Sequence, residues 1–315
     1  MRFHSLRHLL LAFVAVLALA ACHNKDKDQQ EAAKPGGDTP EAAIQQSIDL
    51  IKANDFAGFW KHALPPAEYA TLRADWTRPK PEQQPITDED RAKFAENLRQ
   101  FTEVDAETKL YAQFKPKLAQ MQLQYKDQLP IMIGIVQQIA KTGIDQDKQM
   151  GDTQKQQARD VLGVLAPWAQ QVPWFDQDKA KQAVGTVVTT ARKLGLKSAD
   201  DTRKLDFDSA MQKYAIGFTG VKQLLGIYGL SVDDSLNSAK VTPMESKDGH
   251  ARVKIDYTLL GKPLSTEYAL VQQDGRWYSE DMLRHVHEAH ARLLAPAPSA
   301  STPAPAASAA IATKM

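Results

Sequence analysis

The spacing of apolar residues along the chain is helical from Thr39 to about Leu230. Ile44, Ile48 and Ile51 recur three or four positions apart, which places them on one face of a helix. Thr39 before Pro40 is a favourable helix start, because the hydroxyl can cap the first amides and proline suits the first helical position. Further helices are expected over residues 105–142, 152–171, 176–194 and 206–229.

After Leu230 the spacing changes to alternation. Val253, Ile255, Tyr257 and Leu259 share one side of an extended segment, and polar residues take the other. Asp-Gly pairs at 248–249 and 274–275, with a Gly-Lys-Pro turn at 261–263, predict tight turns between strands. The expected fold is therefore α+β: a large helical bundle portion, a four-stranded antiparallel meander over residues 239–280 and a closing helix over residues 281–294.

Two segments, residues 129–140 and residues 215–230, are apolar round most of a helical circumference. Such helices are usually buried, so we expect both at the centre of the bundle. The alternative is that they line a pocket for an acyl chain or another apolar ligand.

The N-terminus has the features of a secretory signal. Arg2 and Arg7 precede an apolar run of residues 9–20, which is shorter than the ~20 residues of a membrane-spanning helix. The run ends in Leu19-Ala20-Ala21-Cys22, which resembles the lipobox of bacterial lipoproteins. That resemblance implies cleavage between Ala21 and Cys22, a diacylglycerol group on the cysteine sulfur and a fatty acid such as palmitate on its amino group. The alternative is a plain signal peptide with an incidental cysteine.

The residue after Cys22 is His23 and not aspartate. In Gram-negative lipoproteins this pattern implies transfer to the outer membrane, with the protein facing the periplasm; retention in the inner membrane is the less favoured alternative. Two or more acyl chains give stable anchoring, so the membrane would be a partner through Cys22.

Composition divides the chain into five parts. Residues 1–21 are the signal peptide, and residues 22–39 are charged and contain Pro-Gly-Gly, as in a flexible tether. Residues 40–230 form the helical region, and residues 231–294 form the meander with its closing helix. Residues 295–315 are an Ala/Pro/Ser-rich tail, which we expect to be disordered.

A leading helix pair over residues 39–72, followed late in the chain by a meander that ends in DGRWY, resembles the NTF2-like and cystatin-like domains of bacterial lipoproteins. The resemblance covers about a third of the chain, and its motifs are generic. It gives no function, because such folds host both enzymes and binding modules.

The charge of the chain is balanced. Beyond Cys22 the chain has 37 basic and 38 acidic residues, because Arg2 and Arg7 belong to the signal peptide. This balance predicts no nucleic-acid partner and gives no electrostatic footprint for anionic lipid. Cys22 is the single cysteine, so no disulfide or thiolate metal site is expected in the mature chain.

Three histidines fall within residues 282–293. His287-Glu288 is followed by His290, one residue earlier than the His-Glu-x-x-His spacing of zinc peptidases requires. On a helix, His287 and His290 lie ~60° apart and could share a metal, whereas His285 points elsewhere. The favoured interpretation is an amphipathic helix with boundary histidines and no metal; a two-histidine metal site is the alternative.

Trp168, Trp174 and Phe175 gather near the end of a predicted helix. Exposed, these aromatic rings would form a binding patch for a sugar or a protein; buried, they would form a corner of the core. Burial is the favoured interpretation.

No GxSxG, SxxK, Walker or GxGxxG pattern occurs in a usable context. The sequence therefore favours a non-enzymatic binding or structural protein of the envelope, with an envelope protein as partner and no cofactor. Three alternatives stay open: a carrier or sensor of an apolar ligand, a metal-dependent hydrolase using His287 and His290, and an immunity or inhibitor lipoprotein directed against an envelope-targeting enzyme.

Overall fold

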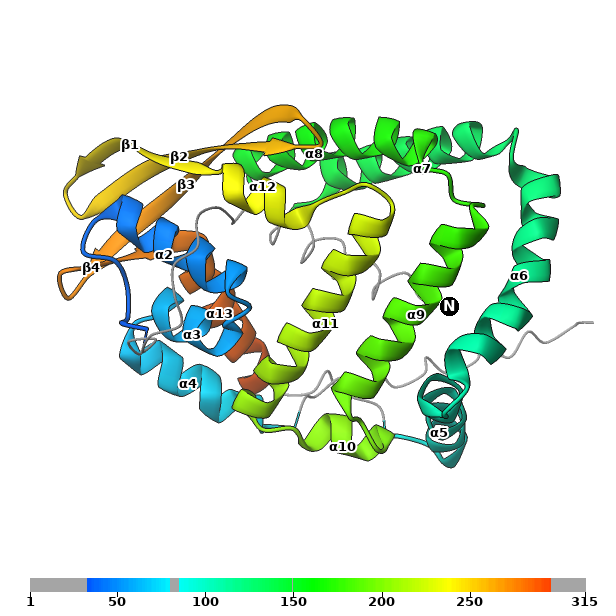
Figure 1. Ribbon diagram of the computed structural model, residues 1–315. Coiled ribbons are helices and arrows are strands. Elements are labelled where there is room, and N and C mark those ends of the chain that lie inside the picture. The colour runs from blue at the N-terminus through cyan, green and yellow to red at the C-terminus, as the bar shows by residue number, and fades with distance from the viewer. Residues whose placement is uncertain (1–32, 80–84, 149, 296–315) are drawn as a thin grey trace, which may run out of the picture.

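The computed structural model describes residues 33–79, 85–148 and 150–295. It has the predicted α+β fold, mostly helical with a four-stranded antiparallel sheet followed by a C-terminal helix (Figure 1). The predicted signal peptide, Cys22, the first part of the tether and the tail beyond residue 295 lie outside the described residues.

The sheet is a meander in which each strand pairs with the next. Its strands follow the order β1-β2-β3-β4 and all pairs are antiparallel. Asp248-Gly249 and Asp274-Gly275 have positive φ at both positions, the backbone of a two-residue hairpin turn whose twist matches the flanking strands. The strands are β1 (Lys240–Lys247), β2 (His250–Leu259), β3 (Lys262–Gln273) and β4 (Arg276–Ser279).

One face of the sheet carries the main hydrophobic core. Val253, Ile255 and Leu259 of β2 are fully buried there, as their alternation predicts. Three helices cover this face: α2 (Pro40–Lys52), α8 (Asp152–Gln171) and α12 (Val232–Ser238). The opposite face is solvated and carries cross-strand ion pairs from Arg252 to Glu245 and Glu267.

A second group of helices closes the end of the sheet at β4. It consists of α3 (Phe56–Ala63), α4 (Pro66–Trp76) and α13 (Glu280–Leu294). Leu64, Tyr278, Leu283 and Val286 form a buried cluster between these helices and the sheet. The side chain of Ser279 caps α13, so β4 passes directly into the closing helix.

The remaining helices extend away from the sheet. Figure 1 shows β1 at one side of the molecule and α6 at the other, with α9 and α11 running side by side between them. These helices are α5 (Asp88–Thr102), α6 (Ala106–Tyr125), α7 (Leu129–Gln146), α9 (Gln177–Leu194), α10 (Ala199–Lys204) and α11 (Phe207–Ile227). Within this part, α9 packs against α5, α6 and α11, and α7 packs chiefly against α8.

The predicted tether of residues 22–39 is too long at its C-terminal end, because residues 33–39 are packed into the fold. Gly37 and Trp277 exchange two backbone hydrogen bonds, of 3.1 and 2.9 Å. Arg276 donates to the carbonyl oxygens of Pro35 and Gly36 and pairs with Asp38. Lys34 is held through its carbonyl oxygen, 2.8 Å from Nδ1 of the buried His62. The Pro-Gly-Gly sequence predicts a flexible segment. In the fold, however, Gly36 and Gly37 have no side chains, which allows their backbone to pack closely against Tyr278 and Ala43.

No single helix in the described ranges is long and apolar enough to cross a bilayer. The pair formed by α11 and α12 meets the length and composition requirement only when joined, and the two helices lie at 99° to each other.

Two Gly→Ala substitutions test the packing of the N-terminal segment. A methyl group at Gly37 would overlap the backbone of Ala43, whereas one at Gly134 in α7 would meet no atom within 4 Å. We expect Gly37→Ala to lower the free energy of unfolding by about 1–3 kcal/mol, because the overlap displaces the segment. Gly134→Ala should leave it unchanged or raise it by about 0.5–1 kcal/mol, since alanine favours a helix. Urea titration followed by circular dichroism measures both, and equal stability of the two variants would contradict the packing described here.

Candidate functional site

Helix α7 is apolar on two opposite sides. The half-buried residues Ile133, Ala140 and Ile144 lie on the side that packs against α8. The opposite side carries five large aliphatic side chains in two rows with helical spacing: Ile131, Ile135 and Ile139 in one, and Met132 and Val136 in the other. A soluble helix normally has only one apolar side, which faces the core.

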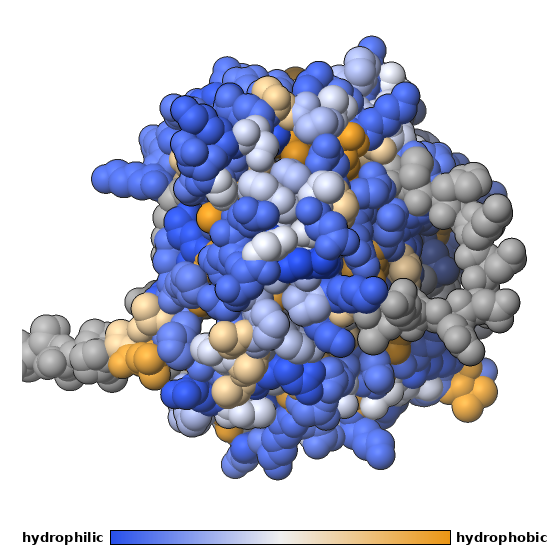
Figure 2. Space-filling model, turned by 90° about the vertical axis from the view of Figure 1, so that its left-hand side faces the viewer, coloured by the Kyte–Doolittle hydropathy of each residue, from blue (hydrophilic) through white to orange (hydrophobic). Residues whose placement is uncertain are grey.

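The outward side chains of α7 are exposed to solvent. The exposed fractions are 67% for Ile131, 44% for Met132, 56% for Ile135, 63% for Val136 and 66% for Ile139. Single exposed aliphatic residues are common, but a continuous row of them marks an interaction surface. We call these five residues the α7 face. In contrast, Figure 2 shows a side of the molecule that is mostly hydrophilic with scattered apolar residues.

The expected central position of residues 129–140 is therefore wrong. They form most of α7, in which none of the described residues is buried. The segment over residues 215–230 is more covered: most of it belongs to α11, whose half-buried Phe218 and Leu225 pack against the sheet core, although Val221 on the same helix is 38% exposed. Gly220 approaches Thr190 of α9 closely, so a side chain there would collide with it. Both segments are apolar all round, so composition could not show which one is covered.

Four lysines lie on α6, on α7 or between these two helices. Lys115 and Lys117 on α6, Lys126 at the corner before α7, and Lys141 on α7 are all exposed. Residues 110–144 contain these four lysines and one acid, Asp127, which gives this segment a net charge of +3. None of the four lysines forms an ion pair with a carboxylate in the described part of the chain. The site therefore combines an aliphatic row with unneutralised positive charge.

The histidine cluster connects two helices. Nδ1 of His290 lies 2.5 Å from Oδ2 of Asp75 on α4, and Asp75 is buried. The other oxygen of Asp75 lies 2.9 Å from Nε of Arg78. One turn earlier on α13, Nε2 of His287 lies 3.7 Å from Oε1 of Glu68. Each histidine thus faces its own carboxylate on α4.

His287 and His290 are paired with different carboxylates in this arrangement, Glu68 and Asp75. Among the described residues no group of three or more His, Cys, Asp or Glu side chains is placed to hold a metal. His285 is exposed. What the arrangement can do is fix α13 against α4, by polar contacts that the sequence pattern of α13 alone does not reveal.

The aromatic patch is a packed corner. The Trp168 ring lies edge-on to Trp174 with their centroids 5.8 Å apart, and Trp174 lies 5.1 Å from the ring of Tyr228. Both indole N–H groups donate to backbone oxygens, Trp168 to Tyr228 and Trp174 to Ala169. Phe175 is half-buried beside them. Both indole N–H groups are therefore hydrogen-bonded within the fold. The ring contacts join the end of α8 to the end of α11.

Two open grooves lie on the described surface. A groove of about 570 Å³ between α9 and α11 is lined mainly by polar residues, including Gln182, Thr186 and Lys193. A second, of about 430 Å³, lies beside α13 and includes His250, Glu280 and His287. His250 and Glu280 pair with each other at 2.8 Å. Both grooves are open to solvent, and neither encloses a cavity of the kind that an acyl chain needs.

Gln157 of α8 is a buried polar residue between this helix and the sheet. Its Oε1 accepts a hydrogen bond of 2.9 Å from Thr266. Tyr257 lies buried on the same side of the sheet, and burial raises the pKa of its hydroxyl. This polar contact aligns α8 on β3, and with it α7.

Searches of protein-family models, of curated proteins and of solved structures gave no match to this chain. The resemblance to NTF2-like and cystatin-like domains therefore stays a hypothesis. The predicted lipidation of Cys22 also stays a prediction, since that residue lies outside the described residues.

Substitutions in α13 separate a structural role from metal binding. His290→Ala removes a hydrogen bond to a buried carboxylate, so we expect the free energy of unfolding to fall by about 1–3 kcal/mol. His285→Ala changes an exposed residue of the same helix and should stay within about 0.5 kcal/mol of the parent chain. Thermal and urea denaturation in the presence of a chelator give both values. If His290→Ala is as stable as the parent but loses stoichiometric zinc, the metal-hydrolase alternative would be favoured instead.

Proposed function

We propose that this protein is a lipid-anchored, non-enzymatic binding protein of the bacterial envelope, tethered through Cys22 and binding through the α7 face. The N-terminal pattern, with Leu19-Ala20-Ala21-Cys22 at its end, supports the anchor. His23 supports an outer-membrane position facing the periplasm.

The single observation that carries the binding role is the exposure of the α7 face. Exposing five aliphatic side chains has a cost, because burying one Ile, Val or Met side chain fully contributes about 1.5–3 kcal/mol. That contribution is largely unused in the described fold, since these residues are 44–67% exposed. A partner that covers the face would recover it.

The other functions considered from the sequence have less support. A metal hydrolase would need His287 and His290 to share an ion, but each faces a different carboxylate of α4. A carrier would need an apolar pocket, whereas the aliphatic residues of α7 lie on an open face. An immunity or inhibitor protein would be one form of binding protein, and no contact in the fold favours it over others.

The anchor is tested by incorporation of labelled palmitate. Cells that express the full chain should yield a labelled protein, and Cys22→Ala should abolish the label, because no other cysteine can carry the diacylglycerol group. His23→Ala, which leaves the cysteine in place, is the matched control and should keep the label. Equal labelling of the Cys22→Ala chain would contradict the lipid anchor.

The binding surface is tested by photo-crosslinking in the same cells. A photoreactive residue in place of Ile135 should form an adduct, because its side chain lies in the middle of the α7 face. The same residue in place of Met244, an exposed side chain on β1, is the control and should give much less adduct. Adduct formation that is equal at the two positions, or missing at both, would contradict a binding role for α7.

A further inference from the structure

We propose that the corner formed by α6 and α7 docks on the surface of a bilayer that contains anionic phospholipid. This contact would be a second attachment to the membrane, non-covalent and separate from Cys22. The inference rests on the proposed function, since it names the partner of the α7 face.

The distribution of charge favours an anionic surface. The mature chain as a whole is nearly neutral, which by itself predicts no attraction to anionic lipid. Lys115 and Lys117 lie on α6, Lys126 between the helices and Lys141 on α7. Residues 106–146, which include both helices, carry five lysines against three carboxylates, a net charge of +2. Basic residues close to an anionic bilayer each contribute about 1 kcal/mol of attraction at low ionic strength.

The chemistry of the α7 face favours lipid over a folded protein. Residues that dominate protein–protein binding are enriched in Trp, Tyr and Arg, which provide both area and directional hydrogen bonds. Residues 129–146 contain none of these three types. The face consists of isoleucine, valine and methionine, whose burial among acyl chains needs no directional partner.

The shape of α7 also suits a bilayer surface. A helix of 18 residues is about 27 Å long. Its exposed aliphatic residues, from Ile131 to Ile139, span about 12 Å of that length, and the opposite side is held on α8. Such a helix can lie in the plane of the interface with one side in the headgroup region, although it does not cross the membrane.

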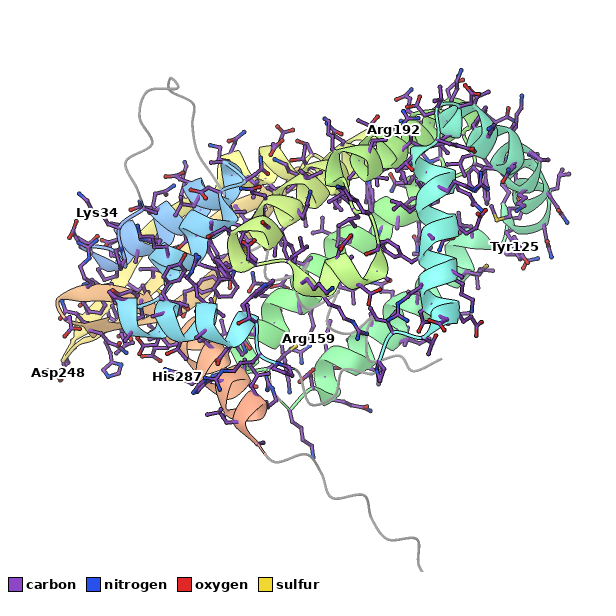
Figure 3. All side chains as sticks on the ribbon, turned by 90° about the horizontal axis from the view of Figure 1, so that it is seen from below. Lys34, Tyr125, Arg159, Arg192, Asp248 and His287 are labelled. Atoms are coloured by element: carbon purple, nitrogen blue, oxygen red, sulfur yellow. The ribbon has the colours of Figure 1, made fainter. Side chains whose placement is uncertain are left out.

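The position of the anchor makes simultaneous attachment feasible. The described chain begins at Ala33, so the eleven residue steps from Cys22 reach at most about 36–40 Å when fully extended. Figure 3 shows Lys34 at one end of the molecule and Tyr125, next to the α6–α7 corner, at the other. Attachment at both ends would lay the long direction of the protein along the membrane. Because the anchor already holds the protein at the bilayer, a weak second contact suffices.

Vesicle binding tests this contact without the covalent anchor. The mature chain with Cys22→Ser keeps every folded element and can be mixed with vesicles of phosphatidylcholine alone or with one third phosphatidylglycerol. Co-sedimentation should show binding to the anionic vesicles that weakens as salt is raised. Adding Ile135→Asp and Ile139→Asp should lower the partition coefficient by about tenfold or more, since two aliphatic side chains no longer insert. Met244→Asp is the control and should bind like the parent, because Met244 is exposed on β1, which lies at the opposite side of the molecule from α6 (Figure 1).

The lysines are tested in the same assay. Lys115→Gln, Lys117→Gln and Lys126→Gln together should reduce binding to anionic vesicles by roughly fivefold per lysine at low salt and leave binding to neutral vesicles unchanged. The proposal is overturned if the parent binds neither kind of vesicle, if the Ile135→Asp/Ile139→Asp chain binds as well as the Met244→Asp chain, or if the triple lysine variant keeps full binding.

Crosslinking in cells separates this inference from the proposed function. With the photoreactive residue at position 135, mass spectrometry should identify a phospholipid adduct. An adduct with one defined protein would overturn membrane docking and leave the proposed binding function intact. The absence of any adduct at position 135 would overturn both.

Discussion

The fold depends on covering the apolar face of the four-stranded meander. Alternation along β2 directs Val253, Ile255 and Leu259 to one side of the sheet, where water must be excluded. Helices α2, α8 and α12 provide that cover although they come from distant parts of the chain. Each of them is then fixed in direction by the sheet, and the hydrogen bond between Gln157 and Thr266 adds a polar constraint on α8.

The exposure of α7 follows from this arrangement. Since one flank of α8 packs on β3, α7 packs on another flank and lies one layer further from the sheet. No described helix covers its outer side, where Ile131, Ile135 and Ile139 are more than half exposed. The helix that is apolar all round is thus at the periphery and not at the centre. A surface of this kind is consistent with the proposed position beside a membrane, where the aliphatic side chains could be buried among acyl chains.

At the other end of the molecule, polar contacts hold the N-terminal segment and the closing helix in place. Arg276 and His62 hold the segment at Lys34–Asp38 against the fold, so the folded region begins well before the first helix. His290 and Asp75 fix the closing helix against α4. These contacts join segments that lie far apart in the chain.

The sequence by itself determined the α+β class, the four strands, the closing helix and the bounds of α8, α9 and α11 to within a few residues, because these follow from local periodicity, caps and Asp-Gly turns. It also determined the lipobox pattern around Cys22, which is a matter of linear order. Only the tertiary structure decided which of the two apolar segments packs against the sheet core, since residues 129–140 and 215–230 are both apolar round most of a helix and differ in their neighbours. It alone placed Asp75 beside His290 and residues 33–39 against β4, because these contacts join positions that are far apart in the chain. The lysines on and between α6 and α7 can be read from the sequence. Only the packing of α7 on α8 shows that an exposed aliphatic face accompanies them.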